Sequence, residues 1–232
     1  MRKQDMNCFL ACAGTNGNEV VLGKLLDLAK EKNPDAILFA GGIVNPDVNL
    51  TQKREFISKY FESLGKSGCS AILIPGPYDI PLGEFFRAAI NAEVVFSNIF
   101  VVHATFFSKS NVGVMGLGGL LAGEQDSASP VLRYSHTSAE YFLRNLWHTD
   151  KPMKILLLSE PPSGKLAGER GNGFVDEFIK TYHPNICVVA GKTKCRGFDE
   201  EKHGFVVNPG QLSEMSAAWI DWPNRKIEML DL

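Results

Sequence analysis

The feature that most constrains the fold of this chain is a repeated alternation of short, wholly apolar runs with longer amphipathic segments. Residues 7–13 read NCFLACA, and residues 18–32 follow with a stripe of valine and leucine at helical spacing. Strands that are apolar at every position are buried on both faces, which is typical of parallel strands covered by helices. The sequence therefore predicts an α/β protein whose sheets have parallel strands at their centres.

The alternation continues through most of the chain. Apolar runs bounded by turn residues indicate further strands, and apolar residues spaced three and four apart indicate further helices. Asn172 directly precedes one of these helices and has a side chain suited to capping it. We expect strands at residues 36–40, 71–74, 154–158 and 186–190, and helices at residues 52–66, 82–90, 135–147 and 173–181.

Two stretches contain strand patterns without helices between them, so antiparallel pairing is expected there. Their strands are predicted at residues 93–96, 99–107 and 112–115, and at residues 205–207, 217–220 and 227–229. Together with the parallel strands they predict a four-layer α/β/β/α sandwich of two mixed sheets, in one domain over residues 1–232. A single doubly wound sheet is the alternative, but it leaves the helix-poor stretches unexplained.

Composition excludes several classes of partner. The formal net charge is −2, so no strong field would attract duplex nucleic acid or an anionic membrane. No apolar run is long enough to span a membrane, and the polar residues 1–6 lead directly into a strand, so we expect no signal peptide. The five cysteines form no C-x-x-C pair. Most of them lie in or beside apolar runs, where a reduced thiol serves as a small apolar side chain, and this favours a cytoplasmic location.

Residues 134–147 form a predicted helix that is rich in aromatic side chains. Tyr134, Tyr141, Phe142 and Trp147 give it more apolar surface than one helix face packed on a sheet requires. Core packing is the expected use of these residues. A homo-oligomer interface, where aromatic side chains are enriched, is the alternative.

Five of the predicted strands end in a short polar or glycine-rich turn. In open α/β sheets, ligands bind outside the carboxyl ends of the strands, so these turns are expected to line one rim. One of them, Gly191-Lys192-Thr193, matches the end of a P-loop, but a P-loop needs glycine where this chain has Ile186. The turn is therefore not a P-loop. The five turns lie at residues 14–18, 41–42, 75–79, 159–162 and 191–194.

The order of these turns resembles that of the calcineurin-like metallophosphoesterases, whose motifs run D-x-H-G, G-D, G-N-H-[D/E], a later H, G-H-x-H and often N-P-G. The resemblance covers about residues 8–230, and it extends to a small subgroup through IPGPYD at residues 74–79 and LRY at residues 132–134. It implies the calcineurin-like phosphoesterase fold. This chain reads GTNG at 14–17, GG at 41–42, GPYD at 76–79, SE at 159–160, GKTK at 191–194 and NPG at 208–210.

The resemblance also implies that the usual metal ligands are missing. Members of the family hold two metal ions that bridge an attacking hydroxide, with Asp, His and Asn side chains. Glycine and proline side chains cannot coordinate a metal, and a charged lysine has no free lone pair. We therefore expect no cofactor and no hydrolysis of the usual kind. The residues at the family's ligand positions are Gly14, Asn16, Gly42, Pro77, Tyr78, Glu160, Lys192 and Lys194.

The lysines suggest a different use of the rim. Lys192 and Lys194, with the backbone amides near residues 16–18, are suited to binding an anion, and Glu160 is a candidate partner for one lysine. We expect a phosphorylated small molecule or nucleotide to bind without hydrolysis; lysines that merely point into solvent are the alternative. The predicted cleft consists of Asn16, Asn18, Tyr78, Asp79, Glu160, Lys192, Lys194 and Asn208.

Two other functions stay open. One is an active metal-dependent phosphoesterase, either a phosphodiesterase or a phosphatase, with a rearranged metal site. That site would hold manganese or another divalent ion, with His103 or His203 as a candidate ligand. The other is a protein-interaction scaffold without a chemical step.

Overall fold

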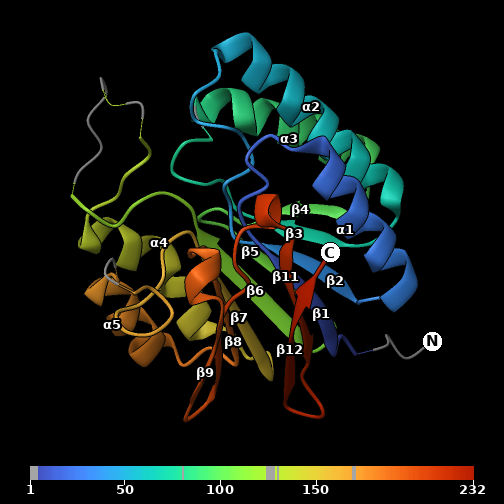
Figure 1. The fold of residues 1–232 in the computed structure, drawn as a ribbon. Coiled ribbons are helices and arrows are strands. Elements are labelled where there is room, and N and C mark those ends of the chain that lie inside the picture. Colours follow the sequence, from blue (N-terminus) through green and yellow to red (C-terminus); the bar gives the residue numbers. More distant parts are fainter. Residues whose placement is uncertain (1–4, 80, 124–128, 130, 169–170) are drawn as a thin grey trace.

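Two six-stranded sheets lie face to face, and helices cover both outer faces of the pair (Figure 1). This computed structural model describes residues 5–79, 81–123, 129, 131–168 and 171–232. Residues 1–4 of the polar start, on which the expectation of no signal peptide depended, lie outside this part. The four-layer α/β/β/α sandwich of two mixed sheets predicted from the sequence is confirmed.

The first sheet has the strand order β12-β11-β1-β2-β3-β4. Strands β1 to β4 run parallel, whereas β11 pairs antiparallel with β1 and β12 pairs antiparallel with β11. Its strands are β1 (Cys8–Cys12), β2 (Ala36–Phe39), β3 (Ala71–Leu73), β4 (Ile99–Val101), β11 (Ser216–Asp221) and β12 (Lys226–Asp231). Its outer face is covered by helices α1 (Glu19–Lys32), α2 (Leu50–Ser67) and α3 (Leu82–Val95).

The second sheet has the strand order β5-β6-β7-β8-β10-β9. The four central strands are parallel and the two edge strands are antiparallel to their neighbours. Its strands are β5 (Phe106–Lys109), β6 (Val112–Leu117), β7 (Met153–Leu158), β8 (Ile186–Val189), β9 (Gly197–Glu201) and β10 (Gly204–Asn208). Helices α4 (His136–His148) and α5 (Gly173–Tyr182) cover it, and short 3₁₀ turns η1 (Thr193–Cys195) and η2 (Leu212–Glu214) follow β8 and β10.

The apolar strands have the predicted double burial. Along β1, Phe9 and Ala11 point into the layer between the sheets, whereas Leu10 and Cys12 pack against the helices. Because successive strand side chains point to opposite faces, both faces must be apolar. The predicted cap is confirmed as well, since the Asn172 side chain accepts a hydrogen bond from the first turn of α5.

Two predicted strand assignments and one predicted pairing are wrong. Residues 93–96 do not form a strand, because the buried stripe of α3 continues to Ala92 and the Phe96 N–H still bonds to the Ala92 carbonyl. Residues 99–107 form two strands in different sheets, separated where Ala104 takes a φ of 55°. The first of them, β4, is parallel rather than antiparallel to its neighbour.

Helix α4 uses the predicted aromatic stretch in two ways. Tyr134 and Phe142 are partly buried against the core, as the core-packing interpretation predicts, and Ala139, Leu143 and Leu146 are the buried residues of the helix. Core packing is wrong for Tyr141 and Trp147, because both side chains are exposed. No helix within the described residues combines the length and the apolar character that crossing a membrane requires.

Candidate functional site

The turns that follow β1 and β2 are joined by their backbones. The Gly14 N–H donates to the Gly41 carbonyl at 2.8 Å, and the Asn16 N–H donates to the Gly42 carbonyl at 3.0 Å. Gly14, Gly41 and Gly42 all have positive φ, a region that favours glycine. The chain can therefore fold one turn directly onto the other.

The turn after β3 packs against the turns that follow β1 and β2. A Cβ atom on Gly76 would lie 2.3 Å from the Gly42 nitrogen, and a Cβ atom on Gly42 would lie 3.0 Å from the Gly14 Cα. Both distances are too short for an ordinary contact. The three turns thus pack backbone against backbone, and a side chain at residue 42 would press against the backbone of Gly14.

Gln211 fills the space beside Gly14. A Cβ atom on Gly14 would lie 1.7 Å from the Gln211 Oε1. That oxygen accepts a hydrogen bond from the Asn16 side-chain amide at 3.3 Å, and the Gln211 amide donates to the Gly191 carbonyl at 2.6 Å. Gln211 therefore links the turn after β1 to the turn after β8. No sequence pattern predicts this role for Gln211, although the residue directly follows the NPG motif at residues 208–210.

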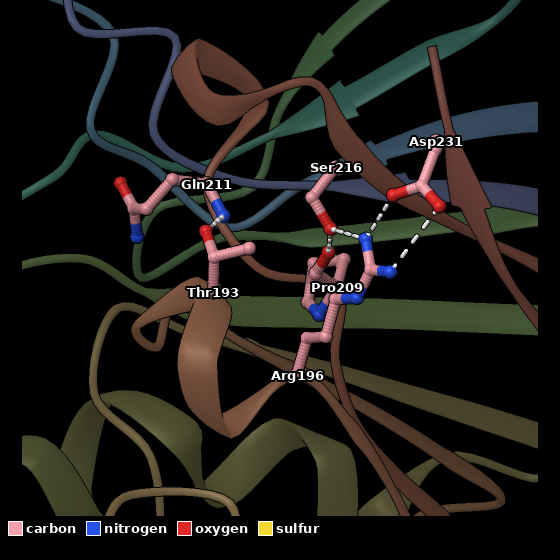
Figure 2. Close-up of polar contacts among 6 residues, drawn as sticks. All are labelled: Thr193, Arg196, Pro209, Gln211, Ser216 and Asp231. Atoms are coloured by element: carbon pink, nitrogen blue, oxygen red, sulfur yellow. Dashed lines mark hydrogen bonds and ion pairs between the residues drawn. The ribbon is translucent and has the colours of Figure 1, made fainter.

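The turn after β8 is fixed from two sides. The Thr193 hydroxyl accepts a hydrogen bond from the Gln211 backbone N–H at 2.9 Å (Figure 2). The Asn208 amide donates to the carbonyls of Lys192 at 3.2 Å and Cys195 at 3.0 Å. The side chain of Asn208 is fully buried, so these contacts are shielded from water. The backbone that carries both candidate lysines is therefore well anchored.

Arg196 ties this turn to the first sheet. Its guanidinium donates to the Ser216 hydroxyl at 3.1 Å and forms an ion pair with Asp231 (Figure 2). The Ser216 hydroxyl in turn donates to the Pro209 carbonyl at 2.7 Å. Since Ser216 and Asp231 belong to β11 and β12, this network spans the two sheets beside the rim.

Lys192 and Lys194 flank Thr193 on the turn after β8. Both side chains are exposed, and within the described part of the chain neither makes a hydrogen bond or an ion pair. The positive charge of Arg196 is already matched by Asp231. Among the residues that the structure describes, the two ammonium groups of this turn therefore have no hydrogen-bond or ion-pair partner.

Glu160 does not pair with either lysine. Its Oε2 accepts hydrogen bonds from the Leu121 N–H at 2.5 Å and from the Asn172 amide at 3.0 Å. Burial raises the pKa of Glu160, and these two hydrogen bonds oppose that shift. The carboxylate holds the start of α5 against the loop after β6, and the suggested pairing with a lysine does not form.

Asp79 lies inside the rim rather than on its surface. Its side chain is fully buried and accepts three backbone N–H hydrogen bonds, from Ile43 at 2.9 Å, Val44 at 2.8 Å and Gly76 at 2.6 Å. Burial raises the pKa of Asp79, although each of these bonds works in the opposite direction. Asp79 thus joins the turn after β2 to the turn after β3.

The other predicted cleft residues differ in exposure. Asn18 caps α1 by accepting hydrogen bonds from the N–H groups of Val20 and Val21. The Asn16 amide also donates to the Ser213 hydroxyl at 3.0 Å. Tyr78 is exposed, with Lys53 donating to its carbonyl oxygen. Of the eight predicted residues, only Tyr78, Lys192 and Lys194 present exposed side chains at this rim.

The two candidate histidines, His103 and His203, lie in different surroundings. His103 Nδ1 accepts a hydrogen bond from the Gly118 N–H at 3.0 Å, and its Nε2 lies 2.8 Å from the Tyr134 hydroxyl. Burial lowers the pKa of His103 to about 4, so the ring is neutral at physiological pH. His203 lies against His183, with ring centroids 4.5 Å apart. The described residues contain no group of three or more His, Cys, Asp or Glu side chains that could hold a metal.

Comparison with known proteins identifies relatives over the full length of the chain. The family model described as metallophosphoesterase, calcineurin superfamily, matches residues 1–232. The solved structure of TT1561 of Thermus thermophilus is 31% identical, with a TM-score of 0.88, and the match covers 98% of this chain and 99% of that chain. No curated protein matches the sequence.

More distant structures share the fold alone. A novel archaeal phosphodiesterase is 11% identical with a TM-score of 0.53, and the match covers 97% of this chain and 99% of that chain. The 5′-nucleotidase from Candida albicans is 13% identical with a TM-score of 0.57, and the match covers 99% of this chain and 52% of that chain.

Proposed function

Because this chain belongs to the calcineurin superfamily of metallophosphoesterases, we propose that it binds a phosphorylated ligand at Lys192 and Lys194 and does not hydrolyse it with a metal pair. The observation that carries this proposal is the set of side chains at this rim, which differs from the family's metal ligands. Gly14, Gly42 and Pro77, which have no side-chain donor atom, stand at three of the positions where the family places metal ligands, and two exposed lysines stand on the anchored turn beside them.

The donor set argues against a metal pair. Two-metal hydrolysis needs several carboxylate, imidazole or amide donors converging on two ions roughly 3.5–4 Å apart, by the usual geometry of such sites. Gly14 and Gly42 supply no side-chain donor. Their turns pack so closely that a Cβ atom on Gly42 would lie 3.0 Å from the Gly14 Cα. Glu160 is the one carboxylate at a family ligand position that remains, and its Oε2 already accepts two hydrogen bonds. These residues do not fit the metal pair of the family.

The anchored turn supports anion binding. Hydrogen bonds from Asn208 and Gln211 fix the backbone around Thr193, so the lysine Cα positions are set before a ligand arrives. The ammonium groups would donate hydrogen bonds to phosphoryl oxygens and balance their charge. Because both lysines are exposed, we expect weak binding, with a dissociation constant of roughly 0.1–1 mM for a simple phosphate.

Calorimetric titration with inorganic phosphate and with a nucleoside monophosphate tests the binding step. The double variant Lys192→Gln/Lys194→Gln should bind at least tenfold more weakly than the wild type. A matched control is Lys180→Gln/Lys202→Gln, which removes the same charge from two exposed lysines on α5 and the β9–β10 turn. Equal affinity in the two double variants, or no binding by the wild type, would contradict the proposal.

A phosphodiester assay with added manganese tests the chemical step. We expect no turnover above the blank, because the rim lacks the donors that would hold two ions. Stoichiometric metal in the purified protein, with turnover that Glu160→Gln abolishes, would establish a rearranged metal site instead. That outcome would replace the proposed binding function with phosphoester hydrolysis.

A further inference from the structure

A hollow of 420 Å³ lies between α3 and α4, and none of the predicted cleft residues lines it. Its volume falls within the range of roughly 300–1,000 Å³ that is usual for small-molecule sites. Most of its wall is apolar and includes the side chains of Phe86, Ile90 and Phe142. The hollow therefore has the size and the lining of a small-molecule site.

Two of the four polar side chains that line the hollow already bond to the backbone of β4. The Glu93 carboxylate accepts a hydrogen bond from the Val101 N–H at 2.8 Å. The Thr105 hydroxyl donates to the Val101 carbonyl at 3.0 Å. The other two polar side chains in the lining are His103 and Tyr134.

The contacts of His103 determine which of its ring nitrogens carries a proton. The buried Gly118 N–H donates to His103 Nδ1 at 3.0 Å, so Nδ1 is an acceptor and has no proton. Because burial lowers the pKa of His103 to about 4, the ring is neutral near pH 7 and carries one N–H. That N–H is therefore at Nε2, which lies 2.8 Å from the Tyr134 hydroxyl oxygen and donates to it.

The Tyr134 hydroxyl is thus left as a donor. Its oxygen accepts from His103, and among the described residues nothing accepts its own proton. The residue is held in place, because its backbone N–H donates to the Leu120 carbonyl at 2.8 Å and its ring packs edge-on against Phe142 with centroids 5.6 Å apart. A fixed hydroxyl donor in an apolar lining is suited to orienting a ligand through one acceptor atom.

We propose that this hollow binds an uncharged, largely apolar carbonyl compound whose oxygen accepts the Tyr134 hydroxyl proton. The apolar walls would shield this hydrogen bond from water and so strengthen it. Glu93 places a negative charge in the lining, which disfavours an anionic ligand. The proposal is independent of phosphate binding, because neither Lys192 nor Lys194 lines the hollow.

A matched pair of probes tests this inference by NMR titration. Acetophenone supplies a carbonyl oxygen, and α-methylstyrene has the same shape with a CH₂ group in place of that oxygen. Acetophenone should shift the amide signals of residues 86–93 and 101–105 and leave those of residues 191–194 unchanged. Its dissociation constant should be on the order of 1 mM, as expected for a molecule of this size. Benzoate, the anionic analogue, should bind more weakly than acetophenone.

Tyr134→Phe isolates the hydroxyl donor. It should weaken acetophenone binding about fivefold, the usual effect of one neutral hydrogen bond, and leave α-methylstyrene within about twofold of the wild type. The carbonyl stretching band of bound acetophenone should lie at a lower wavenumber in the wild type than in this variant. The matched control is Tyr141→Phe, which removes the same hydroxyl from a 61% exposed tyrosine on α4 outside the hollow and should change neither affinity.

Ile90→Ser tests the apolar wall separately from the donor. It should weaken both probes alike, because both would contact this side chain, and thermal melts establish that each variant is folded. The inference would be overturned if acetophenone shifted no signal from the hollow or only signals from the rim. Equal loss of both probes in Tyr134→Phe together with an unchanged carbonyl band would also overturn it, as would tighter binding of benzoate than of acetophenone.

Discussion

Replacing Asp79 with asparagine should destabilise the protein by about 1–3 kcal/mol, because one buried backbone N–H loses its acceptor. Oδ2 accepts from Ile43 and Gly76, and Oδ1 accepts from Val44. An asparagine oxygen in the Oδ2 position keeps the first two bonds, but its amide then faces the Val44 N–H. Asp79→Ala removes all three acceptors and should cost about 3–5 kcal/mol.

The stability difference between Asp79→Asn and the wild type should depend on pH. Burial raises the folded-state pKa of Asp79 above its ordinary value. The contribution of this group to stability is therefore fully present below the ordinary aspartate pKa of about 4, and is lost as pH rises through the raised folded pKa. Asparagine does not titrate. The deficit of Asp79→Asn relative to wild type should consequently be larger near pH 4 than at pH 7.

Urea denaturation at these two pH values measures both effects. Asp47→Asn is the matched control, since Asp47 is exposed and its variant should stay within about 0.5 kcal/mol of wild type. An Asp79→Asn protein as stable as wild type at both pH values would refute the reasoning. So would an alanine variant that is no less stable than the asparagine variant, because the three bonds would then contribute nothing.

Two further substitutions test the rim and the buried histidine. In thermal melts, Gly42→Ala should lower stability by about 1–3 kcal/mol, because the φ of Gly42 is 73° and the new Cβ would lie 3.0 Å from backbone. The control is Gly83→Ala, in α3 with open space around it, which should be neutral or stabilising. Because burial lowers the pKa of His103 to about 4, its contribution is present above the ordinary pKa of about 6.5 and is lost as pH falls toward 4. His103→Gln should remove up to one proton from the pH dependence of unfolding in that window, and an unchanged slope would contradict this assignment.

The parts of the fold that the sequence predicted well are those with a local cause. Strands such as β1, β7 and β8 are buried on both faces, and a short apolar run bounded by turn residues is the local signal of such a strand. Strand β9 reads GFDEE and has no such signal. It is a strand because β10 offers it an open edge, and that pairing depends on tertiary structure.

The candidate site divides in the same way. Glycines at residues 14, 42 and 76 marked the turns, because close backbone approach and positive φ leave a trace in the sequence. The roles of Gln211 and Asp79 depend on contacts between segments far apart in the chain. No spacing rule connects Asn16 to Gln211, which are 195 residues apart. The direction in which a polar side chain points therefore could not be predicted.

The contacts between the turns also predict how the protein responds to metal. In a two-metal rim, the ions themselves would hold the ligand-bearing turns together, so their removal would lower stability. Here Asp79, Gln211 and Asn208 join neighbouring turns by direct hydrogen bonds. These bonds use carboxylate and amide groups that a metal would otherwise compete for.

We therefore expect the thermal midpoint to be the same, within about 1 °C, in excess EDTA and in millimolar manganese, because a ligand that binds only the folded state raises the midpoint. Differential scanning calorimetry of one preparation, divided and dialysed against each solution, measures this directly. A midpoint several degrees higher in manganese would show that the folded protein binds the ion. Repeating the scan with Asp79→Asn then separates the two explanations for such a shift. If the turns are joined by hydrogen bonds, the variant melts lower in both solutions by the same amount, whereas a metal-held rim would let manganese restore part of the loss.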